Sequence, residues 1–194
     1  MTSLGSRSSF LPADLAQPTI RKAAMGDIQP LLKLINGYAT EGIMLPRTEF
    51  EMSENIRDFS VAYDGPRLVG CGALHFYTPT SGEVRSLAVD PDSKTQGLGR
   101  MIVEALEKEA SDNGLHAIFA FTYVPVFFRK MGFREVERGE LPLKVWKDCL
   151  RCPKFSCCDE IAMVKALRSD PVLGTAAEPD ASLVQLPQIK PIRS

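Results

Sequence analysis

The sequence lacks a surplus of charge, a long apolar run and an internal repeat. Its 194 residues carry a formal net charge of -1, which gives no electrostatic reason to bind nucleic acid. No apolar run approaches the roughly 20 residues that span a bilayer, and the Ser-rich N-terminus has no apolar signal-peptide core. We therefore expect no nucleic-acid partner, no membrane contact and a cytoplasmic location.

What the sequence does contain is the composition of a globular domain. Hydrophobic residues make up 44% and charged residues 24%, which is enough apolar surface for one core. Residues 1–18 are expected to be a flexible leader. Residues 169–194, which hold four prolines without sustained periodicity, are expected to be a disordered tail. The folded domain is then expected to span residues 19–168.

Apolar periodicity and turn residues predict alternating strands and helices. Thr48, with Glu51 three residues later, forms a capping box, and Asp27 is expected to cap an earlier helix. Asp64-Gly65-Pro66 is typical of a hairpin turn. Strands are expected over 19–23, 59–63, 68–76, 83–89, 116–122, after 132 and over 160–167, and helices after 27, after 48, over 97–113 and over 124–131. This order predicts a mixed α/β fold.

The most informative segment is a helix that begins shortly after an apolar strand. The strand ends at 87–89, and a helix starts near Gly97. Because Gly97 and Gly99 have no Cβ, a ligand can approach the backbone N–H groups, where the helix dipole favours a pyrophosphate. No third spaced glycine supports a dinucleotide fold, and no Gly-Lys-Ser/Thr supports a P-loop. Plain turn chemistry remains the alternative.

This segment resembles the acetyl-CoA loop of the GCN5-related N-acetyltransferases, whose pattern is Arg/Gln-x-x-Gly-x-Gly/Ala. Residues 127–133, Phe-Phe-Arg-Lys-Met-Gly-Phe, are similar to the short helix ending in Gly-Phe of the same family. The resemblance covers residues 19–167. It implies the family's fold, in which helices flank a central mixed sheet that is mostly antiparallel.

The resemblance implies acetyl-CoA as cosubstrate and no required metal. It implies that the strand backbone pairs with the pantetheine arm and that the loop amides hold the pyrophosphate. The implied cofactor-binding residues are Leu87, Ala88, Val89, Lys94, Thr95, Gln96, Gly97, Leu98, Gly99, Arg100, Phe127 and Phe128. Lys94 departs from the usual Arg or Gln and loses the planar fork of arginine. Phe128 stands where many members have a tyrosine that protonates the leaving thiolate.

Several further phrases are similar to the acetyltransferase domain of N-acetylglutamate synthases in a short, free-standing form. They lie at residues 41–47, 83–89, 121–123, 141–142 and 146–149. The resemblance implies L-glutamate as the acceptor, and with it the first step of arginine biosynthesis. L-Glutamine or another small amine, a protein amine, and a non-catalytic acyl-CoA sensor remain open as alternatives.

The acceptor site is expected to hold carboxylates through cationic groups. The resemblance implies that Arg47 binds a glutamate carboxylate, with a solvated helix-start charge as the alternative. Arg85 lies within a strand and needs a partner, which Glu83 or an acidic substrate would provide; a structural ion pair is the alternative. The resemblance also places Thr122 in this site. Tyr123, at a strand end, is the expected general acid.

Acetyl transfer needs a neutral amine, and an α-amine is mostly protonated at pH 7, so a base must take a proton. Glu83 lies where related histone acetyltransferases have their catalytic glutamate, which implies that it is this base. Strand alternation predicts that Glu83, Arg85, Leu87 and Val89 share one face. His75 is the competing base, with a hydrogen-bonded sheet histidine as its alternative.

The five cysteines do not form a secreted disulfide pattern, because their number is odd and Cys71 lies within a strand. The other four are Cys149, Cys152, Cys157 and Cys158. Free or buried thiols, a zinc site and a labile disulfide all remain open for them. The oligomeric state is open as well, with a homodimer among the options.

Overall fold

The computed structural model describes residues 18–141, 154 and 157–168. Residues 1–17 and 169–194, and with them almost all of the expected leader and the tail, lie outside the described residues. Cys149 and Cys152 lie outside them as well. Within the described part of the chain, no helix combines the length and the apolar character that crossing a membrane requires.

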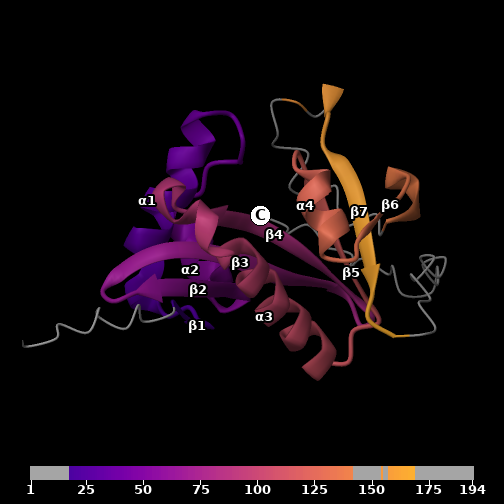
Figure 1. Cartoon of the computed structure of the whole chain (residues 1–194), viewed down its shortest axis with the longest axis horizontal. Helices are drawn as coiled ribbons and strands as arrows, with labels where there is room; N and C mark the ends of the chain where they lie inside the picture. The colour runs from indigo at the N-terminus through magenta and orange to yellow at the C-terminus, as the bar shows by residue number, and fades with distance from the viewer. Residues whose placement is uncertain (1–17, 142–153, 155–156, 169–194) are drawn as a thin grey trace, which may run out of the picture.

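The described elements follow one another in the order that the sequence predicts (Figure 1). The strands are β1 (Thr19–Lys22), β2 (Phe59–Asp64), β3 (Arg67–Thr78), β4 (Ser81–Val89), β5 (Ala117–Thr122), β6 (Arg134–Glu135) and β7 (Ile161–Ala166). The α-helices are α1 (Ile28–Thr40), α2 (Glu49–Asn55), α3 (Leu98–Asp112) and α4 (Pro125–Lys130). Short 3-10 turns are η1 (Met25–Asp27), η2 (Ile56–Asp58), η3 (Pro91–Gln96) and η4 (Arg138–Glu140). The predicted mixed α/β fold is confirmed.

The strands form one sheet in the order β1-β2-β3-β4-β5-β7-β6. All neighbours are antiparallel except β4 and β5, which run parallel. A parallel pair needs a crossover connection, and η3 and α3 provide it. The last strand, β7, lies between β5 and β6, so the chain returns to complete the sheet beside β5.

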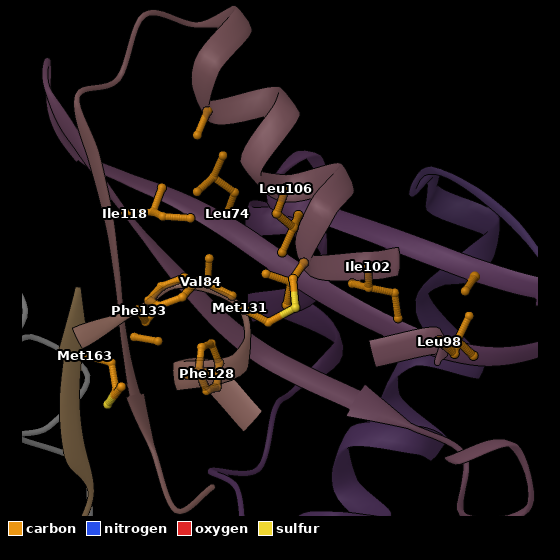
Figure 2. Close-up of a cluster of buried hydrophobic side chains, with 14 of the residues drawn as sticks. Leu74, Val84, Leu98, Ile102, Leu106, Ile118, Phe128, Met131, Phe133 and Met163 are labelled. Atoms are coloured by element: carbon orange, nitrogen blue, oxygen red, sulfur yellow. The ribbon is translucent and has the colours of Figure 1, made fainter. Parts of the chain in front are cut away.

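Helices cover both faces of the sheet. On one face, α3 and α4 enclose a core, and Figure 2 labels Leu98, Ile102 and Leu106 among its side chains. Gly72 of β3 lets α3 approach closely, because a Cβ there would lie 2.8 Å from Ile102. On the other face, α1 and α2 cover a second core around Leu31 and other buried residues.

The alternation of side chains along β4 breaks at Ser86. Two steps along β3, from Cys71 to Ala73, oppose three steps along β4, from Ala88 to Arg85. Ser86 is the extra residue and has a φ of 51°, as expected for a β-bulge. The prediction that Glu83, Arg85, Leu87 and Val89 share one face is therefore wrong.

The bulge sorts the residues of β4 onto the two faces. Leu87 and Val89 pack on the core beside α3, whereas Ala88 packs on the core beneath α1 and α2. Arg85 pairs with Ala73, which lines the second core. Arg85 thus lies on the α1–α2 side, opposite to Leu87.

Asp27 lies at the N-cap position of α1, but its side chain does not cap that helix. Its carboxylate accepts hydrogen bonds from the Arg21 guanidinium at 2.7 and 2.8 Å, from the Ala24 N–H at 2.7 Å and from the Tyr63 hydroxyl at 2.8 Å. The predicted cap is wrong because the carboxylate binds these partners instead of the first N–H groups of α1. The carboxylate instead joins β1, η1 and β2, and the Arg21 guanidinium holds the pKa of Asp27 well below its usual range.

Replacing Asp27 with asparagine is expected to lower the free energy of unfolding at pH 7 by about 1–2 kcal/mol, with screening at the half-exposed Arg21 keeping the loss modest. A lowered pKa contributes stability that is complete above the ordinary value of 3.8 and is lost as pH falls through the folded value. The gap between wild type and variant should therefore narrow between pH 5 and pH 2, as followed by urea unfolding.

Asp64→Asn is the matched control, because Asp64 is exposed and undergoes the same change from carboxylate to amide. Its variant should unfold like wild type at every pH. A gap for Asp27→Asn that stays constant down to pH 2 would show that the carboxylate's charge contributes nothing to stability.

Candidate active site

The strands β4 and β5 part soon after they meet. Their described residues pair only at Ser81 with Ala117, Gly82 with Ile118, and Glu83 with Phe119. Both strands continue, to Val89 and Thr122 respectively, and the bulge at Ser86 lies just beyond the last pair. In Figure 1 the two ribbons separate here. We call this divergence of β4 and β5 after Glu83 the fork. It leaves an edge of β4, from Arg85 to Val89, whose backbone groups do not pair with β5.

A helix start lies at the end of this edge. Gly97 has a φ of 70°, a left-handed conformation that favours glycine, and α3 begins at the next residue. The Met101 N–H donates to Gly97 O at 3.2 Å, so the N–H groups of Leu98, Gly99 and Arg100 precede the intrahelical ladder. Free N–H groups at a helix start, together with the helix dipole, favour an anion.

Polar contacts fix the connection between the edge and the helix. The Tyr38 hydroxyl of α1 donates to Val89 O at 2.6 Å. The Asp90 N–H donates to Val69 O at 2.8 Å, and Arg67 donates to the Asp90 carboxylate at 2.8 Å, which lowers the pKa of Asp90. The edge and the helix start are thus held together.

The structure places the sequence-predicted cofactor residues around this edge. Lys94, Thr95 and Gln96 end η3. The side chain of Arg100 turns along α3 to Glu104, at 2.8 Å, so its backbone N–H is what it offers at the helix start. Phe127 lies beside Gly99, 3.6 Å from where a Cβ would stand.

Phe128 is a core residue. Its ring makes edge contacts with Phe127 at 5.2 Å and with Phe133 at 5.1 Å, and it is 3% exposed. Figure 2 shows it beside Met131 and Phe133. A tyrosine hydroxyl would need a hydrogen-bond partner in this environment, which accounts for phenylalanine at this position.

Ionisable side chains gather at the base of the fork, on the α1–α2 face. Glu83 belongs to the last β4–β5 pair and is 9% exposed, and His75 is its partner on β3. Asp58 of η2 lies 2.5 Å from His75 Nδ1 and 3.4 Å from an Arg85 guanidinium nitrogen. Asp58 is therefore a partner of Arg85 that the sequence analysis did not name.

Arg47 lies in the connection between α1 and α2, and Asn36 holds its backbone. The Arg47 N–H donates to Asn36 Oδ1 at 2.8 Å, and the Asn36 amide donates to Arg47 O at 2.9 Å. Arg47 thus precedes a helix whose start is fixed by the predicted capping box of Thr48 and Glu51. Sequence reasoning missed Asn36, because its partner is a backbone 11 residues away.

Thr122 and Tyr123 end β5. Thr122 is buried and its hydroxyl accepts a hydrogen bond from the Val124 N–H at 2.9 Å. The Lys154 ammonium donates to the Tyr123 hydroxyl at 3.3 Å and lies 4.9 Å from the ring centre. Burial raises the pKa of Tyr123, and Lys154 opposes this shift. The phenol is therefore protonated at neutral pH.

The described cysteines are free thiols. Cys71 is fully buried, which raises its pKa to about 12, while Cys157 is exposed and Cys158 is half-buried. Among the described residues, no three His, Cys, Asp or Glu side chains are grouped to hold a metal ion. The other half of the predicted cysteine cluster, Cys149 and Cys152, lies outside the described residues.

The extended edge and the helix start together fit an acyl-CoA molecule. An amide-bearing arm can pair with the backbone of β4, and a pyrophosphate fits the N–H groups at α3. The glycine conformation at 97 leaves open space where a side chain would stand. The fold and this site define an acyltransferase.

Comparisons with known proteins agree with this class. Residues 55–135 match the family model described as an acetyltransferase (GNAT) domain. An uncharacterized N-acetyltransferase of Chlorobaculum tepidum is 43% identical over 152 residues, which cover 78% of this chain and 98% of that protein. An amino-acid acetyltransferase of Mycobacterium tuberculosis is 33% identical over 138 residues, which cover 70% and 79%.

A solved structure has a similar fold. The N-acetylglutamate synthase of Neisseria gonorrhoeae, in complex with coenzyme A and N-acetyl-glutamate, superposes with a TM-score of 0.72 at 28% identity. The match covers 80% of this chain and 36% of that one, so this chain corresponds to about a third of the longer protein. The chain belongs to the GCN5-related N-acetyltransferase (GNAT) family. It is an N-acetyltransferase that uses acetyl-CoA, as the sequence analysis predicted.

Proposed function

We propose that this enzyme acetylates the α-amine of L-glutamate and that its acetyltransferase domain spans residues 19–168. The observation that carries the proposal is the group of Glu83, Arg85, Asp58 and His75 at the base of the fork. An acceptor there lies at the end of the strand edge on which the thioester would be bound. The relatives named amino-acid acetyltransferase and N-acetylglutamate synthase support an amino-acid acceptor, and the reaction would be the first step of arginine biosynthesis.

The acyl donor is assigned to the edge of β4 and the start of α3. Leu87, Ala88 and Val89 offer backbone groups to the pantetheine arm, and residues 94–100 offer N–H groups to the pyrophosphate. Phe127 packs beside this helix start. Bound acetyl-CoA supplies the activated acetyl group; the protein's own residues position the acceptor and move its proton.

The acceptor is assigned to cationic side chains on the α1–α2 face. Arg47 is held at its backbone by Asn36, so its guanidinium starts from a fixed point and binds a carboxylate with less loss of entropy. Arg85, with an 11% exposed side chain beside Asp58, provides a second positive charge at the base of the fork. Thr122 lies across the fork from Arg85, as the last residue of β5.

Proton transfer is assigned to Glu83 and Tyr123. Glu83 lies at the base of the fork, where an amine would meet the thioester, and a carboxylate there can accept the amine's proton. The protonated phenol of Tyr123 at the end of β5 is the proposed donor to the departing thiolate.

A screen of acceptors tests the proposal directly. Release of CoA is measured with L-glutamate, L-glutamine, L-aspartate, L-lysine and a short peptide bearing a free amine. We expect the highest kcat/KM with L-glutamate. A higher value with the peptide would assign the enzyme to protein acetylation. Binding of acetyl-CoA without CoA release for any of these amines would overturn an amino-acid acceptor.

Replacing Arg47 with alanine is expected to raise the KM for glutamate by roughly 30- to 150-fold. The reason is the loss of a charge-assisted contact worth about 2–3 kcal/mol. The KM for acetyl-CoA should stay unchanged, because the strand edge and helix start are not touched. Steady-state kinetics with each substrate varied in turn measures both constants.

Asn36→Asp is the matched variant, because aspartate still accepts from the Arg47 N–H but cannot donate to Arg47 O. It should raise the same KM by a smaller factor. Equal damage to both substrate constants in Arg47→Ala would show instead that Arg47 supports the fold.

A further inference from the structure

An aspartate and a histidine form a short hydrogen-bonded pair next to Glu83. Asp58 Oδ2 and His75 Nδ1 lie 2.5 Å apart, and both side chains are partly buried. The His75 ring also makes an edge contact with Tyr77 at 4.9 Å between centroids. The carboxylate and the aromatic neighbour together fix both the position and the plane of the imidazole.

This contact selects one form of the neutral imidazole. A carboxylate only accepts hydrogen bonds, so the proton of neutral His75 must lie on Nδ1. The other ring nitrogen, Nε2, is then left with a lone pair that can accept a proton.

The position of His75 connects Glu83 with solvent. His75 and Glu83 are direct partners in the β3–β4 ladder, so their Cβ atoms lie on one face and about 5 Å apart. Glu83 is 9% exposed, whereas the His75 side chain is 31% exposed. A buried base must return its proton to water after each turnover, and the more exposed imidazole beside it offers a route.

We propose that Asp58 and His75 relay the acceptor's proton from Glu83 to solvent. The Glu83 O–H bond breaks as the Nε2–H bond forms, and the Nε2 proton then passes to water or buffer, which restores the neutral ring. The charged and titratable groups around the ring are Asp58 from η2, Glu83 and Arg85 from β4, and Tyr77 on its own strand. Asp58 is a positioning residue in this step. The relay rests on the proposed function of Glu83.

The form of the imidazole is tested by two-bond 1H–15N NMR at pH 8. The chain has two histidines, so the spectrum of His116→Gln contains only the signals of His75 and thereby assigns both residues. We expect wild-type His75 to carry its proton on Nδ1, and Asp58→Ala, which removes the acceptor, to lose this preference without changing His116. A wild-type His75 with its proton on Nε2 would overturn the relay. This measurement does not depend on any acceptor.

The transfer step is tested by buffer rescue, with the amino acid that gives most CoA release in the screen. We expect His75→Gln to lower kcat by roughly 10- to 100-fold, less than loss of the base itself. Adding imidazole buffer at constant pH should restore kcat in His75→Gln but leave wild type and His116→Gln unchanged. The acetyl-CoA dissociation constant should stay constant.

Asp58→Asn keeps the imidazole and should lose part of kcat, with a shifted pH profile. Loss of kcat without buffer rescue would reduce the pair to a structural contact and overturn the relay, while the acceptor screen still stood. Wild-type kcat in both variants would overturn it as well.

Discussion

Replacing Glu83 with glutamine is expected to lower kcat by roughly 10²–10⁴-fold, the usual contribution of a positioned base. Glutamine keeps the size and hydrogen-bonding capacity of the side chain, which is 9% exposed and packed at the last β4–β5 pair. It cannot accept a proton from the acceptor amine. Acetyl-CoA binding should remain at the wild-type level, because the cosubstrate is assigned to the strand edge and helix beyond Glu83.

The pH dependence separates loss of a base from loss of structure. At high pH more of the acceptor amine is already neutral, so the difference in kcat between wild type and Glu83→Gln should shrink. Glu54→Gln, on the exposed side of α2, is the control for the same chemical change. A Glu83→Gln enzyme with full kcat from pH 6 to 9 would remove Glu83 from the mechanism and move the search for the base to His75 or a water chain.

Placing an aspartate at position 97 is expected to weaken acetyl-CoA binding by roughly 100-fold or more, since like charges about 4 Å apart repel by about 4 kcal/mol near a protein surface. Gly97 has a φ of 70°, and nothing lies within 4 Å of a Cβ built there. Aspartate tolerates this conformation better than most residues. Its carboxylate would also accept from the N–H groups at the start of α3, which are the groups assigned to the pyrophosphate.

Gly97→Asn is the matched control, because asparagine has the same shape and capping ability without the charge. It should weaken binding by a much smaller factor, and isothermal titration calorimetry with acetyl-CoA measures both. The thermal midpoint of each free variant should stay near wild type, because both side chains cap the helix. Equal affinities for the aspartate and asparagine variants would move the pyrophosphate away from this helix start.

The local features of the fold could be predicted because their causes are local. The Thr48–Glu51 capping box is present, with the Thr48 N–H donating to Glu51 at 2.9 Å. The hairpin turn pairs Asp64 with Arg67. The left-handed glycine at 97 and the helix after it also follow from neighbouring residues. Each of these involves residues at most a few positions apart.

Features that depend on distant partners were missed or mistaken. Asp27 looks like a helix cap, but Arg21 and Tyr63 bind its carboxylate. The bulge at Ser86 depends on the register of β4 against β3 and on the point where β4 leaves β5. Neither can be read from the residues next to Ser86 in the sequence. Asp58 belongs to no motif. The register of the β2–β3 hairpin, which pairs Phe59 with Ala73, is the signal that would have placed it near His75.

The parting of β4 and β5 also has a consequence for self-association. An interior strand normally has both backbone edges satisfied, whereas β4 has one described edge that β5 leaves after Glu83. Such an edge is a template for strand addition by an unfolded or extended chain. The bulge and the packed helices restrict access to it. The geometry that admits an acyl donor is therefore also an interior point at which this sheet offers an unpaired backbone edge, in addition to its outer strands β1 and β6.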